Sequence, residues 1–253
     1  MTIPLDRQAF LRPIAHRGLH DAAQGRVENA WLSFAAAIAK GYGIECDVRP
    51  AAGGRPIVFH DETVDRLIDG AGPVAALKAA DLKRLRYRAN NAERISTFAD
   101  FLDLVAGKVP LLVEVKSEWE PPGRAFMRKI AELANAYRGP LALMSFDPAV
   151  MIALKDLAPT IPRGIVSGLY EGDGWWRTTL SAERAFRLAH LLESGPVAPS
   201  FYAYHIKALP TPVTRYVREV QGLPLFTWTV RTADDRARTN SFADAPIFEG
   251  FEA

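Results

Sequence analysis

Short apolar runs alternate with amphipathic stretches along almost the whole chain. Eight of these runs have the length of strands, and the stretches between them repeat apolar residues three and four positions apart, as about seven helices would. The predicted strands are 12–16, 43–48, 110–116, 140–146, 163–168, 201–206, 223–230 and 245–248. This alternation predicts parallel strands joined by helical crossovers.

Residues at the expected helix ends support the same pattern. Gly41 ends one helical stretch, and Thr97 precedes another. Asp147 and Thr211 have the character of N-caps, and each is followed by proline, which suits the first position of a helix. Thr232, with an acidic residue three positions later, approximates a capping box.

Two architectures fit alternating strands and helices: a closed eight-stranded barrel and an open doubly wound sheet. Eight strand–helix units in 253 residues match the usual size of the barrel. The first predicted strand is not followed by a glycine-rich dinucleotide-binding motif, which weakens the open sheet. We therefore expect an α/β fold, a TIM (β/α)8 barrel, in which residues 1–253 form a single domain.

One segment departs from this alternation of strands and helices. After the second predicted strand, "AAGGRPIVFHD" (51–61) contains a Gly-Gly pair and a further short apolar run, which predicts a hairpin. A turn centred near Gly53 would return the chain so that His60 lies beside Glu45. We expect an insertion at about 51–95, with a short helix in "AALKAADLKRL" (75–85).

Acidic residues share one face of the second predicted strand, "GIECDVRP" (43–50). Because side chains alternate along a strand, Glu45 and Asp47 point the same way. Cys46 points to the opposite face, where we expect a buried small hydrophobe rather than a nucleophile. Glu114 and Lys116 repeat the two-residue spacing on the third predicted strand.

In a TIM barrel, residues at the carboxyl ends of the strands converge on one mouth. This rule brings together His16, Arg17, Glu45, Asp47, His60, Glu114 and Lys116. Three carboxylates held close together repel one another unless a cation compensates them, and an all-oxygen ligand set suits a hard divalent ion. We therefore predict one divalent cation, Mg²⁺ or Ca²⁺, with Mn²⁺ as a further candidate.

The other side chains of this group indicate a phosphate ester as the substrate. Arg17 and Lys116 suit a phosphate, the first as a bidentate donor and the second as an ammonium group. His16 and His60 have an unperturbed pKa of about 6.5, so one can donate a proton while the other accepts one. Together with a metal ion, these groups describe phosphoryl transfer.

Composition narrows the class of protein. The 31 basic and 29 acidic residues leave a net charge of +2, which excludes a strongly basic nucleic-acid-binding protein. A single cysteine excludes an internal disulfide framework and fits a reducing compartment. The N-terminal residues lack the pattern of a secretory signal, and no apolar run has the roughly 20 residues of a membrane span. We expect a cytoplasmic protein without a transmembrane segment, of undetermined oligomeric state.

Several short motifs occur in a recognisable order. "AHRG" (15–18), "EN" (28–29), "ECD" (45–47), "HD" (60–61) and "EVK" (114–116) resemble the signature of glycerophosphodiester phosphodiesterases, and "SFDP" (145–148) and "WTV" (228–230) are similar to later family features. The resemblance spans most of the chain. It implies a TIM barrel with an insertion after the second strand, and hydrolysis of a small-molecule glycerophosphodiester to glycerol 3-phosphate and an alcohol.

The resemblance also implies roles for particular residues. Glu45, Asp47 and Glu114 would be metal ligands, and His16 and His60 would be the acid and the base. The remaining implied residues are Arg17 and Lys116 on the phosphate, Trp228 against the glycerol moiety, and Glu28 and Asn29 in support of the site. A hydroxyl of the substrate next to the phosphate would attack first and give a cyclic phosphate.

Two stretches depart from the family pattern. Val27 stands where proline usually precedes the "EN" pair, and the last predicted strand reads "FADAPIFEGFEA" (242–253) instead of an aspartate-rich "GVDGI-TD" stretch. No functional residue is therefore assigned at the C-terminal end. The short insertion also leaves the size and identity of the substrate open.

The other histidines and tryptophans carry weaker signals. Trp175 and Trp176 are expected on the loop after the fifth strand, as a cover over the substrate. No function is expected for His20, His190 or His205.

Two alternative functions remain open. One is a phospholipase D-like enzyme that acts on lysophospholipids or sphingolipid head groups, and the other is a non-catalytic barrel that binds a phosphorylated metabolite. The histidine pair favours catalysis, because binding alone needs no matched acid and base. A zinc amidohydrolase is disfavoured because the five histidines include no His-x-His pair.

Overall fold

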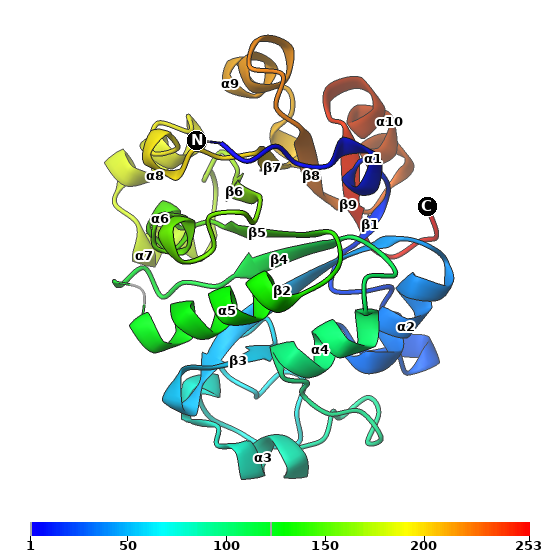
Figure 1. Ribbon diagram of the computed structural model, residues 1–253. Coiled ribbons are helices and arrows are strands. Elements are labelled where there is room, and N and C mark those ends of the chain that lie inside the picture. The colour runs from blue at the N-terminus through cyan, green and yellow to red at the C-terminus, as the bar shows by residue number, and fades with distance from the viewer. Residues whose placement is uncertain (1, 122) are drawn as a thin grey trace.

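The computed structural model describes residues 2–121 and 123–253, which contain a closed barrel of eight parallel strands (Figure 1). In order around the barrel these are β1 (Ile14–Ala15), β2 (Gly43–Ala51), β4 (Leu111–Val115), β5 (Leu141–Ser145), β6 (Arg163–Ser167), β7 (Phe201–His205), β8 (Leu225–Val230) and β9 (Ala245–Phe248). Pairing of β1 with both β2 and β9 closes the ring. The predicted TIM barrel is confirmed.

Helices cover the outside of this barrel (Figure 1). The α-helices among the described residues are α1 (Arg7–Phe10), α2 (Trp31–Ala39), α3 (Ala79–Arg84), α4 (Phe98–Val105), α5 (Arg124–Ala136), α6 (Pro148–Leu157), α7 (Trp176–Thr179), α8 (Ala182–Ala189), α9 (Pro212–Arg215) and α10 (Ala233–Phe242), of which α3 lies in the insertion after β2. The predicted caps are confirmed, because the side chains of Thr97, Asp147, Thr211 and Thr232 accept hydrogen bonds from backbone N–H groups at the starts of α4, α6, α9 and α10.

The predicted hairpin is also present. Strand β3 (Arg55–Val58) pairs antiparallel with β2, with Val48 opposite Val58, and Gly53 takes a φ of +70° in the turn. The following segment, which contains α3, extends away from the barrel in Figure 1. It packs around a small core that it shares with Val27 and Ala30, before α2, and with Ala51 of β2. The residues that the segment contributes to this core include Val64, Ile68, Val74, Leu82, Tyr87 and Ile95.

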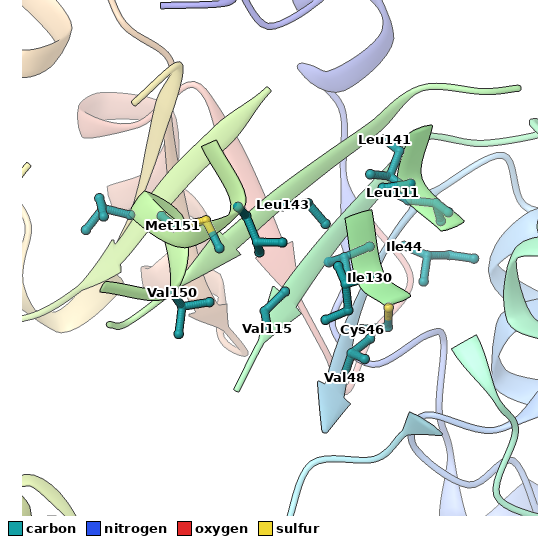
Figure 2. Packing of buried hydrophobic residues seen from close by; sticks show 14 of the residues in the cluster. Ile44, Cys46, Val48, Leu111, Val115, Ile130, Leu141, Leu143, Val150 and Met151 are labelled. Atoms are coloured by element: carbon teal, nitrogen blue, oxygen red, sulfur yellow. The ribbon is translucent and has the colours of Figure 1, made fainter. Parts of the chain in front are cut away.

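The outward face of the strands is apolar. Ile44, Cys46 and Val48 are completely buried and belong to the same core as Ile130 of α5 (Figure 2). Burial raises the pKa of the Cys46 thiol well above its usual value, with a further contribution from the nearby acids. The thiol therefore stays protonated, in agreement with its predicted role as a small hydrophobe.

The inward face is apolar at depth and polar at the rim. Leu112, Met144, Val166, Phe226 and Ile247 form a core with Leu5 and Phe10 of the N-terminal segment. Two residues along β4 from Leu112, the inward position is occupied by Glu114. The barrel interior is therefore packed, and its chemistry lies at the carboxyl end of the strands.

Candidate active site

The pairing of neighbouring strands brings three acidic side chains together at this rim. Asp47 on β2 lies opposite Glu114 on β4, and Glu45 lies one inward position before Asp47. All three residues are buried, and one oxygen atom from each lies within 4.8 Å of the others. The structure thus assembles the acidic group that the alternation of side chains predicted.

Two cations partly neutralise this acidic group. Lys116 Nζ lies 2.5 Å from Glu114 Oε1 and 2.8 Å from Asp47 Oδ1. Arg17 Nε lies 3.2 Å from Asp47 Oδ2, and the backbone N–H of Arg17 donates to Glu45 Oε2 over 3.0 Å. Two positive charges therefore face three carboxyl groups.

Asp47 and Glu45 differ in pKa because Lys116 and Arg17 stabilise mainly the charge of Asp47. Burial opposes the charge on Asp47, but Lys116 and Arg17 outweigh it and hold the pKa of Asp47 well below its usual value. Burial, followed by the charges of Asp47 and Glu114, raises the pKa of Glu45 well above its usual value. Glu45 is therefore the member of the group that lacks compensation.

A divalent cation would supply the positive charge that these carboxyl groups lack. Among the described residues, no group donates a hydrogen bond to the buried Oε1 atom of Glu45. A buried carboxylate oxygen without a partner is costly, and three carboxylates offer the oxygen ligands that hard divalent ions prefer. The three carboxylates therefore have the charge to hold such an ion, and Glu45 contributes an oxygen that no protein group among the described residues occupies.

The loop after β1 positions Arg17 through an uncommon backbone conformation. Arg17 and Gly18 both have positive φ, at +54° and +78°. A Cβ atom at Gly18 would lie 2.6 Å from Ser33 Oγ and 2.9 Å from the Ser33 carbonyl carbon, so only glycine fits there. The "HRG" motif thus turns the chain tightly enough to place Arg17 over the acids.

Glu28 and Asn29 hold this arrangement from the side. Asn29 Nδ2 donates to Asp47 Oδ2 over 2.8 Å, and its Oδ1 accepts from the Asp47 backbone N–H over 3.3 Å. Glu28 Oε1 accepts from Arg17 Nη1 over 2.8 Å. Glu28 is also bound by both terminal nitrogens of Arg66, over 2.8 and 2.7 Å. These contacts fix Asp47 and Arg17 relative to each other.

Each of the two predicted catalytic histidines has a carboxylate on its Nδ1 atom. His16 Nδ1 lies 2.5 Å from Glu249 Oε2, and His60 Nδ1 lies 2.7 Å from Asp61 Oδ1. His16 Nε2 lies 3.9 Å from Oε2 of Glu45. Burial lowers the pKa of His16, and the bond to Glu249 only partly offsets this effect. Both rings border one cavity of about 880 Å³.

An aromatic wall borders the same cavity. It consists of Trp119, Phe146, Trp175 and Trp228. Phe146 contacts Trp228 and Trp175 with ring centroids 5.3 and 5.8 Å apart, and Trp119 stacks on Trp175 at 5.5 Å. The cavity therefore combines charged side chains with a surface suited to an organic group.

Trp228 and Trp175 border the cavity, whereas Trp176 is not among its lining residues. Trp176 packs edge-on against Trp175, with ring centroids 6.1 Å apart. Of the pair that was expected to cover the substrate, the structure brings only Trp175 to the cavity.

Two residues that border the site received no function from the sequence. Glu249 directly follows β9 and contacts His16, and His205 ends β7, lines the cavity and lies 4.9 Å from the Trp228 ring. Both stand at the carboxyl end of a barrel strand. The positional rule that found Glu45 and Glu114 would have found them too, had it been applied to every strand.

Comparison with known proteins identifies the family of this chain. The sequence profile of the glycerophosphoryl diester phosphodiesterase family matches residues 16–248. The chain belongs to this family. It is therefore a phosphoric diester hydrolase that acts on glycerophosphodiesters, which favours the enzyme over the non-catalytic binding barrel.

Relatives in this family come from distant organisms. The chain is 29% identical over 237 residues to a glycerophosphodiester phosphodiesterase of Caldanaerobacter subterraneus subsp. tengcongensis, covering 89% of this chain and 88% of that protein. It is 36% identical over 213 residues to human glycerophosphodiester phosphodiesterase 1, covering 80% of this chain and 57% of the human protein.

The fold is shared with solved structures of the family. A phosphodiesterase from Oleispira antarctica, solved in complex with the product sn-glycerol-3-phosphate, superposes with a TM-score of 0.70 at 22% identity, covering 94% of this chain and 92% of that one. None of the helices among the described residues has the length and hydrophobicity needed to span a bilayer.

The role of the three carboxylates as metal ligands can be tested by substituting Glu45. Substitution of Glu45 by glutamine (Glu45→Gln) removes the uncompensated charge and should weaken binding of Ca²⁺ or Mn²⁺ by about 100-fold or more, measured by titration calorimetry. The matched control is Glu252→Gln, because Glu252 is exposed and pairs only with Lys40 among the described residues. Equal affinity of wild type and Glu45→Gln would contradict this assignment.

Proposed function

We propose that this enzyme hydrolyses glycerophosphodiesters to glycerol 3-phosphate and an alcohol, as a single domain, with one divalent cation bound by Glu45, Asp47 and Glu114. The observation that carries the proposal is the unpartnered, buried oxygen of Glu45 within a three-carboxylate group beside His16. The relative from Oleispira antarctica, which was solved with sn-glycerol-3-phosphate as its product, supports the choice of product.

The phosphate would bind next to the acidic group. Mg²⁺ and Ca²⁺ are the favoured ions, with Mn²⁺ as a further candidate, because all three ligands are carboxylates. A cation bound there would neutralise and polarise the phosphate. Arg17 and Lys116 line the same cavity and would hold the phosphate oxygens, while Glu28 and Asn29 keep Arg17 and Asp47 in place.

The two histidines would transfer protons. One accepts the proton of the attacking hydroxyl, and the other donates a proton to the leaving alcohol. In His16 and His60 the Nδ1 atom is already engaged by a carboxylate, so the Nε2 atom of each ring is the one available for transfer. A hydroxyl of the substrate next to the phosphate would attack first, which gives a cyclic phosphate that water then opens.

The aromatic wall would receive an organic part of the substrate. Trp228 is the candidate contact for the glycerol moiety. The same wall favours a second substrate class, lysophospholipids, because Trp175 keeps 45% of its surface exposed beside a cavity of about 880 Å³. Apolar groups of a lipid would cover such surface.

A substrate screen tests the proposed reaction. Glycerophosphocholine, glycerophosphoethanolamine and lysophosphatidylcholine are each supplied with Mg²⁺, Ca²⁺ or Mn²⁺. Release of glycerol 3-phosphate from the first two is expected, with activity lost in EDTA and restored by added metal. Undiminished rates in chelator would contradict the role of the metal. Preferential cleavage of lysophosphatidylcholine would identify the second substrate class.

The proton-transfer roles of His16 and His60 can be tested by replacing each side chain with alanine. His16→Ala and His60→Ala should each lower kcat by roughly 10²–10⁴-fold, because each removes one proton-transfer group. His190→Ala is the matched control, since His190 lies at the exposed end of α8, away from the cavity-lining residues. Turnover close to wild type in either of the first two variants would remove that histidine from the mechanism.

A further inference from the structure

His16 is held by a carboxylate from the last strand of the barrel. Glu249 is the first residue after β9, and its Oε2 atom lies 2.5 Å from His16 Nδ1. The backbone N–H of His16 donates to the Phe248 carbonyl over 2.8 Å, and that of Glu249 donates to the Val230 carbonyl over 3.1 Å. The pairing of β1, β9 and β8 therefore fixes both partners.

Other polar groups fix the Glu249 carboxylate. Arg231 Nε donates to Glu249 Oε1 over 2.7 Å, and His20 Nε2 lies 3.4 Å from Oε2. Burial opposes the charge, but His16, His20 and Arg231 outweigh it and lower the pKa of Glu249 well below its usual value. The carboxylate is thus ionised and can only accept hydrogen bonds.

An ionised acceptor at this place determines where His16 carries its proton. The Nδ1 atom must donate to Glu249, so the neutral ring has its lone pair on Nε2. This Nε2 atom lies on the side of the acidic group, 3.9 Å from Glu45 Oε2.

We propose that Glu249 is a positioning residue for His16, which holds the Nδ1–H tautomer and directs a basic Nε2 atom at the reaction centre. This proposal rests on the proposed function. Nε2 takes the proton of the attacking hydroxyl as its oxygen bonds to phosphorus, and the leaving alcohol takes a proton from His60 as its own bond to phosphorus breaks. Glu249 then stabilises the imidazolium form of His16.

A metal site is the alternative interpretation of His16, His20 and Glu249, because each of them offers an atom within 4.8 Å of the others. The geometry favours a hydrogen bond. His16 Nδ1 and Glu249 Oε2 lie 2.5 Å apart, which is hydrogen-bond distance. Arg231, bound to the same carboxylate, further disfavours a second cation.

The tautomer of His16 can be measured without any reaction. Nitrogen-15 shifts of the His16 ring, recorded in metal-free protein, should show Nδ1–H in the wild type and a shift toward Nε2–H in Glu249→Ala. The control is Glu252→Ala, which removes an exposed carboxylate of the same C-terminal segment. An unchanged tautomer in Glu249→Ala would overturn the proposal, even if the enzyme cleaves diesters as expected.

Kinetics separate positioning from a merely structural role. Glu249→Ala should lower kcat by about 10²-fold and change KM by less than about threefold, because orientation matters mostly in the transition state. Glu249→Asp, which keeps the carboxylate, should recover part of this loss. A raised KM with unchanged kcat would contradict the proposal.

A double variant tests whether Glu249 acts through His16. His16→Ala/Glu249→Ala should be no more than about threefold slower than His16→Ala alone. Losses that multiply would contradict action through His16.

Mn²⁺ titration should give the same number of bound ions in wild type and Glu249→Ala, and loss of an ion would replace the proposal with a metal site. If no diester is cleaved at all, the proposed function fails, while the ring shifts still decide the tautomer.

Discussion

Mutual repulsion among three buried carboxylates is the constraint on which this site depends. Glu45, Asp47 and Glu114 are held within 4.8 Å of one another, where burial strengthens every charge–charge interaction. Lys116 and Arg17 lie against Asp47 and stabilise its charge, but they leave Glu45 with a raised pKa and an oxygen without a partner. The remaining shortage of positive charge makes this rim suited to a divalent ion, and a bound ion would in turn attract a phosphate.

The barrel can sustain this repulsion because its strands have two different faces. On β2, the outward residues Ile44, Cys46 and Val48 are fully buried against helices. On the inward face, Glu45 borders the cavity and Asp47 is held by Arg17 and Lys116. The strand cannot turn its acids toward solvent without exposing this apolar face. Packing on one face therefore holds the charges on the other, and the β1–β9 pairing positions His16 in the same way.

The regular part of this arrangement was predictable from the sequence. Alternation along "GIECDV" and "LLVEV" specifies which side chains share a face, and the end of each strand specifies which ones reach the rim. The Gly-Gly pair predicted the hairpin that carries His60. The contact between His16 and Glu249 was not predictable in this way, because it depends on how the first and last strands meet when the ring closes. The end of the last strand places Glu249 at the rim, but neither its pattern nor its neighbours in the sequence indicate a partner 233 positions away.

A crystal structure with Mn²⁺ and glycerol 3-phosphate would test the central claim most directly, since anomalous scattering locates the metal independently of any assumption about its ligands. We expect one ion coordinated by Glu45, Asp47 and Glu114, with the phosphate bound to it and close to Arg17 and Lys116. An ion held elsewhere, or a phosphate bound in the cavity while the three carboxylates coordinate no metal, would contradict that claim.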